Sequence, residues 1–89
     1  MIQMRYFASL RERLGTGAEA IPCPSRETPG GATTVADLLL LLRQRGEPWS
    51  DALGGEQTLL AAVNQAMARL DTPVQDGDEV AFFPPVTGG

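Results

Sequence analysis

The stretch "TVADLLLLLRQRG", residues 34–46, predicts the main helix of this chain. Thr34 and Asp37 have the spacing of a capping box, in which each side chain accepts a hydrogen bond from the other residue's backbone N–H, and Gly46 marks the far end. Between these ends, apolar residues recur at the i, i+3, i+4 and i+7 positions that bury one stripe of a helix. They are Val35, Leu38, Leu39 and Leu42, with Leu40 and Leu41 widening the apolar surface. The leucine run therefore predicts the protein core rather than a partner-binding helix.

Two strands are predicted before this helix. Residues 2–7 are rich in β-branched and aromatic residues, and their alternation places Ile2, Met4 and Tyr6 on one face. Residues 18–23 predict a second strand that pairs with the first as a hairpin. The loop after this second strand is rich in Pro, Gly and Thr, and no chemistry is assigned to it.

More strands are predicted after the helix. Two short apolar runs flank Asn64 and Gln65, which indicates a strand, a tight turn and another strand. Asp76 and Gly77 predict a turn before a last strand, Glu79–Phe83.

Two shorter helices complete the expected elements. In "SLRERLG", Ser9 is expected to cap the first turn, Glu12 to reach back to it, and Gly15 to end the helix in a left-handed conformation. A single helical turn is expected after Pro48, with Trp49 packed beneath it. The order of elements predicts an α+β roll, a mixed sheet packed on one main helix. With 89 residues, the chain is expected to be one domain, a body of 1–83 and a tail of 84–89.

The charge and hydropathy of the chain limit the classes of partner that are expected. The net charge is -4, whereas nucleic acids and acidic membrane surfaces would need a basic patch, so neither is expected as a partner and a basic protein surface is a better candidate. The longest apolar run, Val35–Leu42, is broken by Asp37 and is too short to span a bilayer. A cytoplasmic location is expected.

The residue types that are missing argue against catalysis by this chain alone. It contains no His, which is the usual general base near neutral pH and the commonest metal ligand, and all seven of its basic residues are Arg. The single cysteine, Cys23, can form neither an internal disulfide nor a thiolate metal cluster. No metal site and no permanently bound cofactor are expected.

The segment "PPVTGG", residues 84–89, predicts an arm beyond the last strand. Pro84 and Pro85 cannot donate ladder hydrogen bonds, so they end the strand and stiffen the start of the arm. Six residues reach about 20 Å at about 3.3 Å each. Gly88 and Gly89 lack a Cβ and can pass through a narrow channel, so the group that the arm delivers is the α-carboxylate of Gly89.

A carboxylate is a poor electrophile and needs activation by another enzyme. Attack on the α-phosphate of ATP would give an acyl-adenylate, from which a sulfur or amine nucleophile displaces AMP. The tail would then carry a thiocarboxylate or become conjugated to another molecule.

Three stretches resemble a known family: "RYFASLRERLG" at 5–15, "LLAAVNQ" at 59–65 and "DGDEVAFFPPVTGG" at 76–89. They look like the small, sulfur-carrying subunit of molybdopterin synthase, of the ubiquitin-like sulfur carriers with a β-grasp fold. The resemblance implies that an activating enzyme uses ATP to adenylate Gly89 and that sulfur is then carried there as a thiocarboxylate. The large subunit would receive the tail and pass the sulfur to cyclic pyranopterin monophosphate, and two such transfers build the dithiolene of molybdopterin.

The resemblance also implies partners and contact residues. The expected assembly is a heterotetramer of two small and two large subunits, with the catalytic side chains on the large subunit. Surface positions of the family that meet the large subunit or the activating enzyme correspond to Phe7, Arg11, Met67 and Phe83. In the tail, the implied partner-binding residues are Pro84, Pro85, Val86 and Thr87. Gly88 would let the tail pass through a narrow channel of the partner, and Gly89 would carry the sulfur.

Other functions fit the same tail. One is a sulfur carrier for thiamine synthesis or tRNA thiolation, and another is a ubiquitin-like modifier that forms amide bonds through Gly89. A third is a binding module without covalent chemistry.

Overall fold

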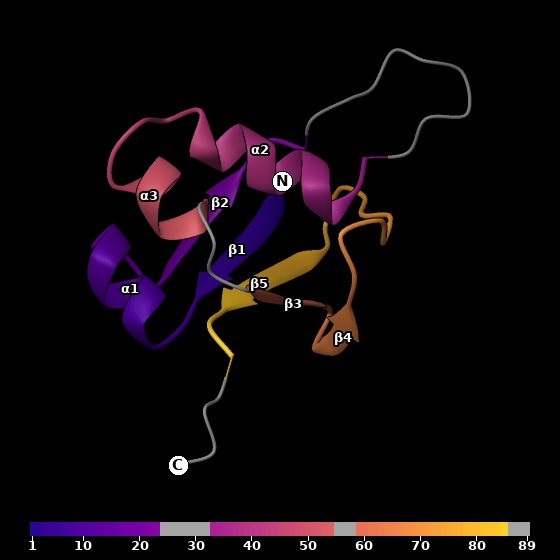
Figure 1. Cartoon of the computed structure of the whole chain (residues 1–89). Helices are drawn as coiled ribbons and strands as arrows, with labels where there is room; N and C mark the ends of the chain where they lie inside the picture. The colour runs from indigo at the N-terminus through magenta and orange to yellow at the C-terminus, as the bar shows by residue number, and fades with distance from the viewer. Residues whose placement is uncertain (24–32, 55–58, 86–89) are drawn as a thin grey trace.

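The computed structural model describes residues 1–23, 33–54 and 59–85. Within these residues the chain forms five strands and three helices (Figure 1). In order they are β1 (Ile2–Tyr6), α1 (Ser9–Leu14), β2 (Ala18–Ile21), α2 (Val35–Arg43), α3 (Trp49–Leu53), β3 (Leu60–Val63), β4 (Ala66–Ala68) and β5 (Glu79–Phe83).

The strands form one mixed sheet in the order β2-β1-β5-β3-β4. The two central strands, β1 and β5, are parallel, and the other three neighbouring pairs are antiparallel. With α2 crossing one face of this sheet, the arrangement is the predicted β-grasp roll (Figure 1). The expected pairing of the first two strands is confirmed, although they end at Tyr6 and Ile21 rather than at Phe7 and Cys23.

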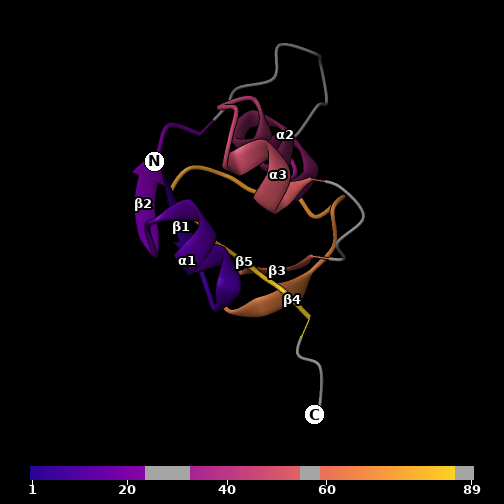
Figure 2. The same cartoon turned by 60° about the vertical axis from the view of Figure 1, so that its left-hand side comes forward.

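The core lies between the sheet and the helices, and α2 and α3 lie on the same side of the sheet (Figure 2). Along β1, Ile2, Met4 and Tyr6 are buried and the residues between them are exposed, so the predicted alternation is confirmed. Val80 and Phe82 supply the same face of β5. This face packs against the buried residues of the helices, which are Leu10, Leu14, Val35, Leu38, Leu42, Ala52 and Leu53.

Helix α2 begins with the predicted capping box. The Thr34 N–H donates to Asp37 Oδ2 at 2.8 Å, and the Asp37 N–H donates to Thr34 Oγ1 at 3.4 Å. The predicted widening of its apolar stripe is wrong, because Leu40 and Leu41 are 54% and 40% exposed. A helix that lies on a sheet buries one stripe, and these two positions face away from it.

Helix α1 begins differently from the prediction. Its N-cap is Ala8, with φ 55 and ψ -134, and no side chain caps the helix, so Ser9 is its first residue and not the expected cap. The Phe7 N–H still donates to the Phe82 carbonyl at 3.3 Å, and the chain must turn away from the sheet within one residue. The predicted left-handed stop at Gly15 is confirmed by its φ of 76.

Two turns join the strands of the second half of the chain. Asn64 and Gln65 have φ values of 51 and 69, which is the conformation of a tight two-residue hairpin turn, as predicted. Gly77, with φ 95, lies in the predicted turn before β5. The Asn64 side chain accepts from the Glu79 N–H at 3.0 Å and donates to Asp78 at 3.2 Å, so the two turns are joined.

Replacing the cap of α2 tests the assignment of the helix ends. Thr34→Ala removes one half of the capping box, and we expect it to lower the free energy of unfolding by about 1 kcal/mol in urea denaturation. Ser9→Ala is the matched control, since the Ser9 side chain caps nothing, and it should change the stability by less than about 0.5 kcal/mol. Equal losses for both variants would contradict the assignment of the caps.

Candidate functional site

On the face of the sheet opposite the helices, two alanines of neighbouring strands lie side by side, flanked by longer side chains. In the register of the strands, Ala62 of β3 lies beside Met67 of β4 and beside Ala81 of β5, and Ala81 lies beside Arg5 of β1. Cross-strand neighbours point to the same side of a sheet, so this row faces away from the core. We call this surface the outer face.

An open groove of about 540 Å³ runs over the outer face. The methyl groups of Ala62 and Ala81 leave a low floor beside the larger rings of Phe7 and Phe83, which is why the surface is hollow there. The groove is lined by Phe7, Ala8, Ala62, Gln65, Glu79, Ala81, Phe83 and Pro84. The structure therefore brings together three of the predicted partner-binding residues, Phe7, Phe83 and Pro84.

Two large apolar side chains of this region are open to solvent. Phe7 is 49% exposed and Met67 is 67% exposed, whereas Ala81 on the groove floor is only 8% exposed. Met67 does not line the groove, but the register places it beside Ala62, which does. An apolar groove with exposed aromatic and thioether side chains beside it is typical of a protein-binding surface.

Arg11 lies at a second hollow, of about 590 Å³, next to the first. Its side chain passes over Gly17, where an added Cβ would meet Arg11 Nε at 2.9 Å. Arg11 is exposed, and it makes no ion pair with any residue of 1–23, 33–54 or 59–85. Phe7 and Arg11 line a further hollow together, so the structure places this predicted cation beside the groove.

The tail residues can be placed only in part. Pro84 and Pro85 follow β5 directly, and β5 ends at Phe83 as predicted. The sequence-predicted residues Val86, Thr87, Gly88 and Gly89 lie outside the described residues. Their roles, and the division into a body and a tail, stay predictions.

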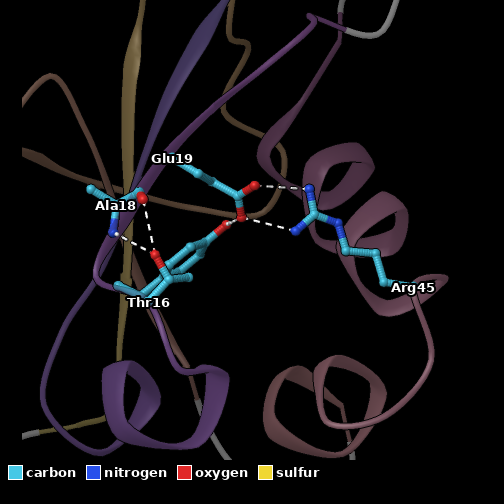
Figure 3. Close-up of polar contacts among 5 residues, drawn as sticks. Thr16, Ala18, Glu19 and Arg45 are labelled. Carbon is cyan, nitrogen blue, oxygen red and sulfur yellow. Dashed lines mark hydrogen bonds and ion pairs between the residues drawn. The ribbon is translucent and has the colours of Figure 1, made fainter.

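A polar cluster that was not predicted from the sequence holds the edge strand β2 to Arg45, which follows α2. Glu19 of β2 accepts from Arg45 Nη1 and Nη2 at 2.9 and 3.0 Å (Figure 3). The Tyr6 hydroxyl donates to the same carboxylate at 2.8 Å. The Arg45 guanidinium stacks 4.5 Å from the centre of the Trp49 ring, which meets the Tyr6 ring edge-on at 5.4 Å. Because Glu19 and Arg45 are 26 residues apart, no local pattern could have revealed their pairing.

The cluster changes the acidity of its members. Burial raises the pKa of Tyr6 well above its ordinary value, and the hydrogen bond to Glu19 raises it further. Burial by itself raises the pKa of Glu19, but the hydrogen bonds from Arg45 and Tyr6 outweigh it and hold that pKa below its ordinary value. The hydrogen bonds to Glu19 raise the pKa of Arg45. Tyr6 stays neutral and the other two stay charged near neutral pH, so the cluster is a structural clamp rather than an acid or base.

Neither a metal site nor a membrane-spanning helix is found in the described part of the chain. There, no three His, Cys, Asp or Glu side chains gather in a way that could hold a metal ion. None of the helices within residues 1–23, 33–54 and 59–85 combines the length and the apolar character needed to cross a bilayer. Cys23 is partly buried against the core.

The Glu19 cluster makes stability depend on pH. Because the folded-state pKa of Glu19 lies below its unfolded value of about 4.3, its contribution is fully present above that value and is lost as the pH falls through the folded-state pKa. We expect the free energy of unfolding to drop as the pH falls below about 4.3. Glu19→Gln should be less stable at pH 6 and lose less on acidification. The fluorescence of Trp49, the single tryptophan, reports unfolding.

Glu12→Gln is the matched control for this prediction. Glu12 is exposed on α1 and has no ion pair within the described residues. This variant should keep the acid-induced loss of the unmodified protein. A Glu19→Gln variant with the same loss would contradict the role given to the cluster.

Comparison with family models gives one match over nearly the whole chain. The model of the ThiS family matches residues 4–89. The match reaches from within β1 to the last residue of the tail.

Curated relatives match from end to end. The molybdopterin synthase sulfur carrier subunit of Escherichia coli is 44% identical over 89 residues, which is 100% of both chains. The protein of the same name from Haemophilus influenzae is 37% identical over 89 residues, again 100% of both chains.

Solved structures agree with the fold. Subunit 1 of a putative molybdopterin converting factor from Pyrococcus furiosus superimposes with a TM-score of 0.68 at 30% identity, covering 96% of this chain and 97% of that chain. A chain of the complex of subunits 1 and 2 of molybdopterin-converting factor from Helicobacter pylori gives a TM-score of 0.62 at 26% identity, covering 99% and 97%. That relative was therefore solved together with a partner subunit.

Proposed function

This chain belongs to the ThiS family, and we propose from that membership that it is a sulfur carrier for molybdenum cofactor synthesis, the small subunit of a molybdopterin synthase. The observation that carries the proposal is the end-to-end correspondence with curated carriers of that name. The groove on the outer face supports it, because it offers a partner an apolar docking surface that reaches Pro84, where the tail begins.

The proposed chemistry takes place at Gly89. A carboxylate oxygen of Gly89 attacks the α-phosphate of ATP on an activating enzyme, which gives the acyl-adenylate and releases pyrophosphate. A sulfur nucleophile then displaces AMP, and the tail carries a thiocarboxylate. Sulfur passes from it to cyclic pyranopterin monophosphate on the large subunit, and two such transfers complete the dithiolene of molybdopterin.

The protein itself supplies binding and delivery in this scheme. With no His and no Lys in the chain, the catalytic side chains are assigned to the large subunit. The proposed assembly contains two small and two large subunits, and the complex of the Helicobacter pylori relative supports a direct contact between the two kinds of subunit. We place this work in the cytoplasm, where ATP is available to the activating enzyme.

The groove is proposed as the contact with the large subunit. Phe7 is a half-exposed aromatic that lines the groove, and a few large side chains buried on binding carry most of the binding energy of an interface. The exposed charge of Arg11 is proposed to meet an acidic group of the partner, since no ion pair within the described residues satisfies it.

Removing the Phe7 ring should weaken this contact without unfolding the domain. We expect Phe7→Ala to raise the Kd for the cognate large subunit about tenfold, or about 1.4 kcal/mol, in isothermal titration calorimetry. Leu40→Ala is the control, because Leu40 is similarly exposed but belongs to α2, away from the groove. Equal effects of the two variants would show that the contact lies elsewhere.

The function itself is tested by reconstitution. The chain is incubated with its activating enzyme, ATP and a sulfur donor, then with the large subunit and cyclic pyranopterin monophosphate, and molybdopterin is measured. We expect product from the unmodified chain and none from a variant with one alanine added after Gly89. Equal product from the extended variant would favour a binding module without covalent chemistry.

The alternative recipients give different outcomes. A carrier for thiamine synthesis or tRNA thiolation would leave molybdopterin unchanged in a deletion strain and would reduce thiamine or thiolated tRNA instead. A modifier would be found with Gly89 joined to lysines of other proteins. The molybdopterin proposal predicts that the molybdenum cofactor is lost in that strain.

A further inference from the structure

The backbone of Ala8 has a conformation that its own residue type disfavours. With φ 55 and ψ -134, it lies at positive φ, where an L-residue with a Cβ is strained and glycine is not. Among the described residues, the other non-glycine positions of this kind are Asn64 and Gln65, and the hairpin turn between β3 and β4 requires both. Ala8 instead lies in the turn from β1 into α1, which the Leu10 N–H closes by donating to the Phe7 carbonyl at 3.2 Å.

The core does not explain why this position is an alanine. Ala8 is exposed, so its methyl group adds nothing to the buried cluster. The chain uses glycine at other positive-φ positions, namely Gly15, Gly46 and Gly77. A glycine at position 8 would satisfy the fold with less strain.

Hydrogen bonds hold the backbone on both sides of Ala8. Before it, the Phe7 N–H donates to the Phe82 carbonyl at 3.3 Å, which ties the residue to β5. After it, the Ala8 carbonyl accepts from the N–H groups of Arg11 and Glu12 at 3.1 and 3.4 Å, which ties it to the first turn of α1. The strained residue is thus a short rigid joint between the sheet and the helix.

This joint lies between two residues that the proposed function assigns to partner binding. Ala8 lines the groove together with Phe7 and Phe83, and it also lines the neighbouring hollow together with Arg11. A change of φ or ψ at Ala8 therefore moves the Phe7 ring relative to the Arg11 guanidinium.

We propose that Ala8 is a positioning residue whose strained and rigid backbone fixes the Phe7 ring and the Arg11 side chain in the arrangement that the partner recognises. Strain that the surrounding hydrogen bonds maintain is a recognised feature of binding sites, where it limits the loss of conformational freedom on association. Ala8 itself acts through its neighbours, chiefly through Phe7. The inference rests on the proposed function, because the readout is binding to the large subunit of molybdopterin synthase.

Ala8→Gly separates positioning from folding. Glycine accepts the same φ and ψ without strain but does not enforce them, so we expect the urea midpoint to stay unchanged or to rise. The Kd for the cognate large subunit should increase about three- to fivefold, which corresponds to the conformational freedom that glycine restores. Ala20→Gly is the matched control: Ala20 is an exposed residue of β2, so this variant should lower the urea midpoint and leave the Kd unchanged.

A double-mutant cycle shows whether Ala8 acts through Phe7. In a Phe7→Ala background, Ala8→Gly should change the Kd by less than half of its effect in the unmodified protein, because the ring that it positions is gone. The inference would be overturned by an unchanged Kd for Ala8→Gly, by an equal effect in both backgrounds, or by a lower urea midpoint than that of the unmodified protein. If the unmodified protein itself did not bind the large subunit, the proposed function would fail and take this inference with it.

Discussion

The parallel pairing of β1 with β5 is the constraint on which the rest of this structure depends. Its register places Gln3 beside Glu79 and Tyr6 beside Phe82, so residues near the two ends of the chain form the centre of the sheet. Parallel neighbours finish at the same edge of a sheet, and Phe7 therefore comes to lie close to Phe83 and Pro84. The groove on the outer face and the start of the tail both depend on this one pairing.

The two faces of the central strands serve different purposes. One carries Ile2, Met4, Tyr6, Val80 and Phe82 into the core, and the helices cover it. The other carries Arg5, Ala81 and Phe83, which none of the described helices covers, and the groove lies on this side. At the far edge, the Glu19 cluster attaches β2 to the residues around α3 through one carboxylate that three donor groups satisfy. The body is thus well suited to be a fixed platform for a docking surface and a reactive tail.

Local patterns in the sequence were enough to predict most elements of the fold. The capping box of α2, the alternation in β1 and the turn at Asn64 and Gln65 each depend on neighbours within a few residues. Ser9 misled the prediction of the first cap because the cap is set by where β1 leaves the sheet, which is a tertiary event. The buried stripe of α2 was predicted too wide at Leu40 and Leu41, because composition alone does not say which side of an apolar helix faces the sheet.

Several residues of the candidate site could be predicted from the sequence, but the shape of the groove that they line could not. The resemblance to a family supplied Phe7 and Phe83, yet the hollow beside them exists because Ala62 and Ala81 are brought side by side by strand pairing. The pairing of Glu19 with Arg45 and the strained backbone of Ala8 likewise arise only when distant segments meet. Which distant strands pair, and in which register, could not be predicted from local sequence patterns.

The central claim is that this domain carries sulfur on the carboxylate of Gly89, and the intact mass of the protein tests it most directly. The chain is purified without a C-terminal tag after expression with its activating enzyme and sulfur donor. We expect a gain of about 16 Da, the replacement of one oxygen by sulfur, which fragmentation assigns to Gly89. An unchanged mass in the presence of ATP, sulfur donor and a competent activating enzyme would contradict it.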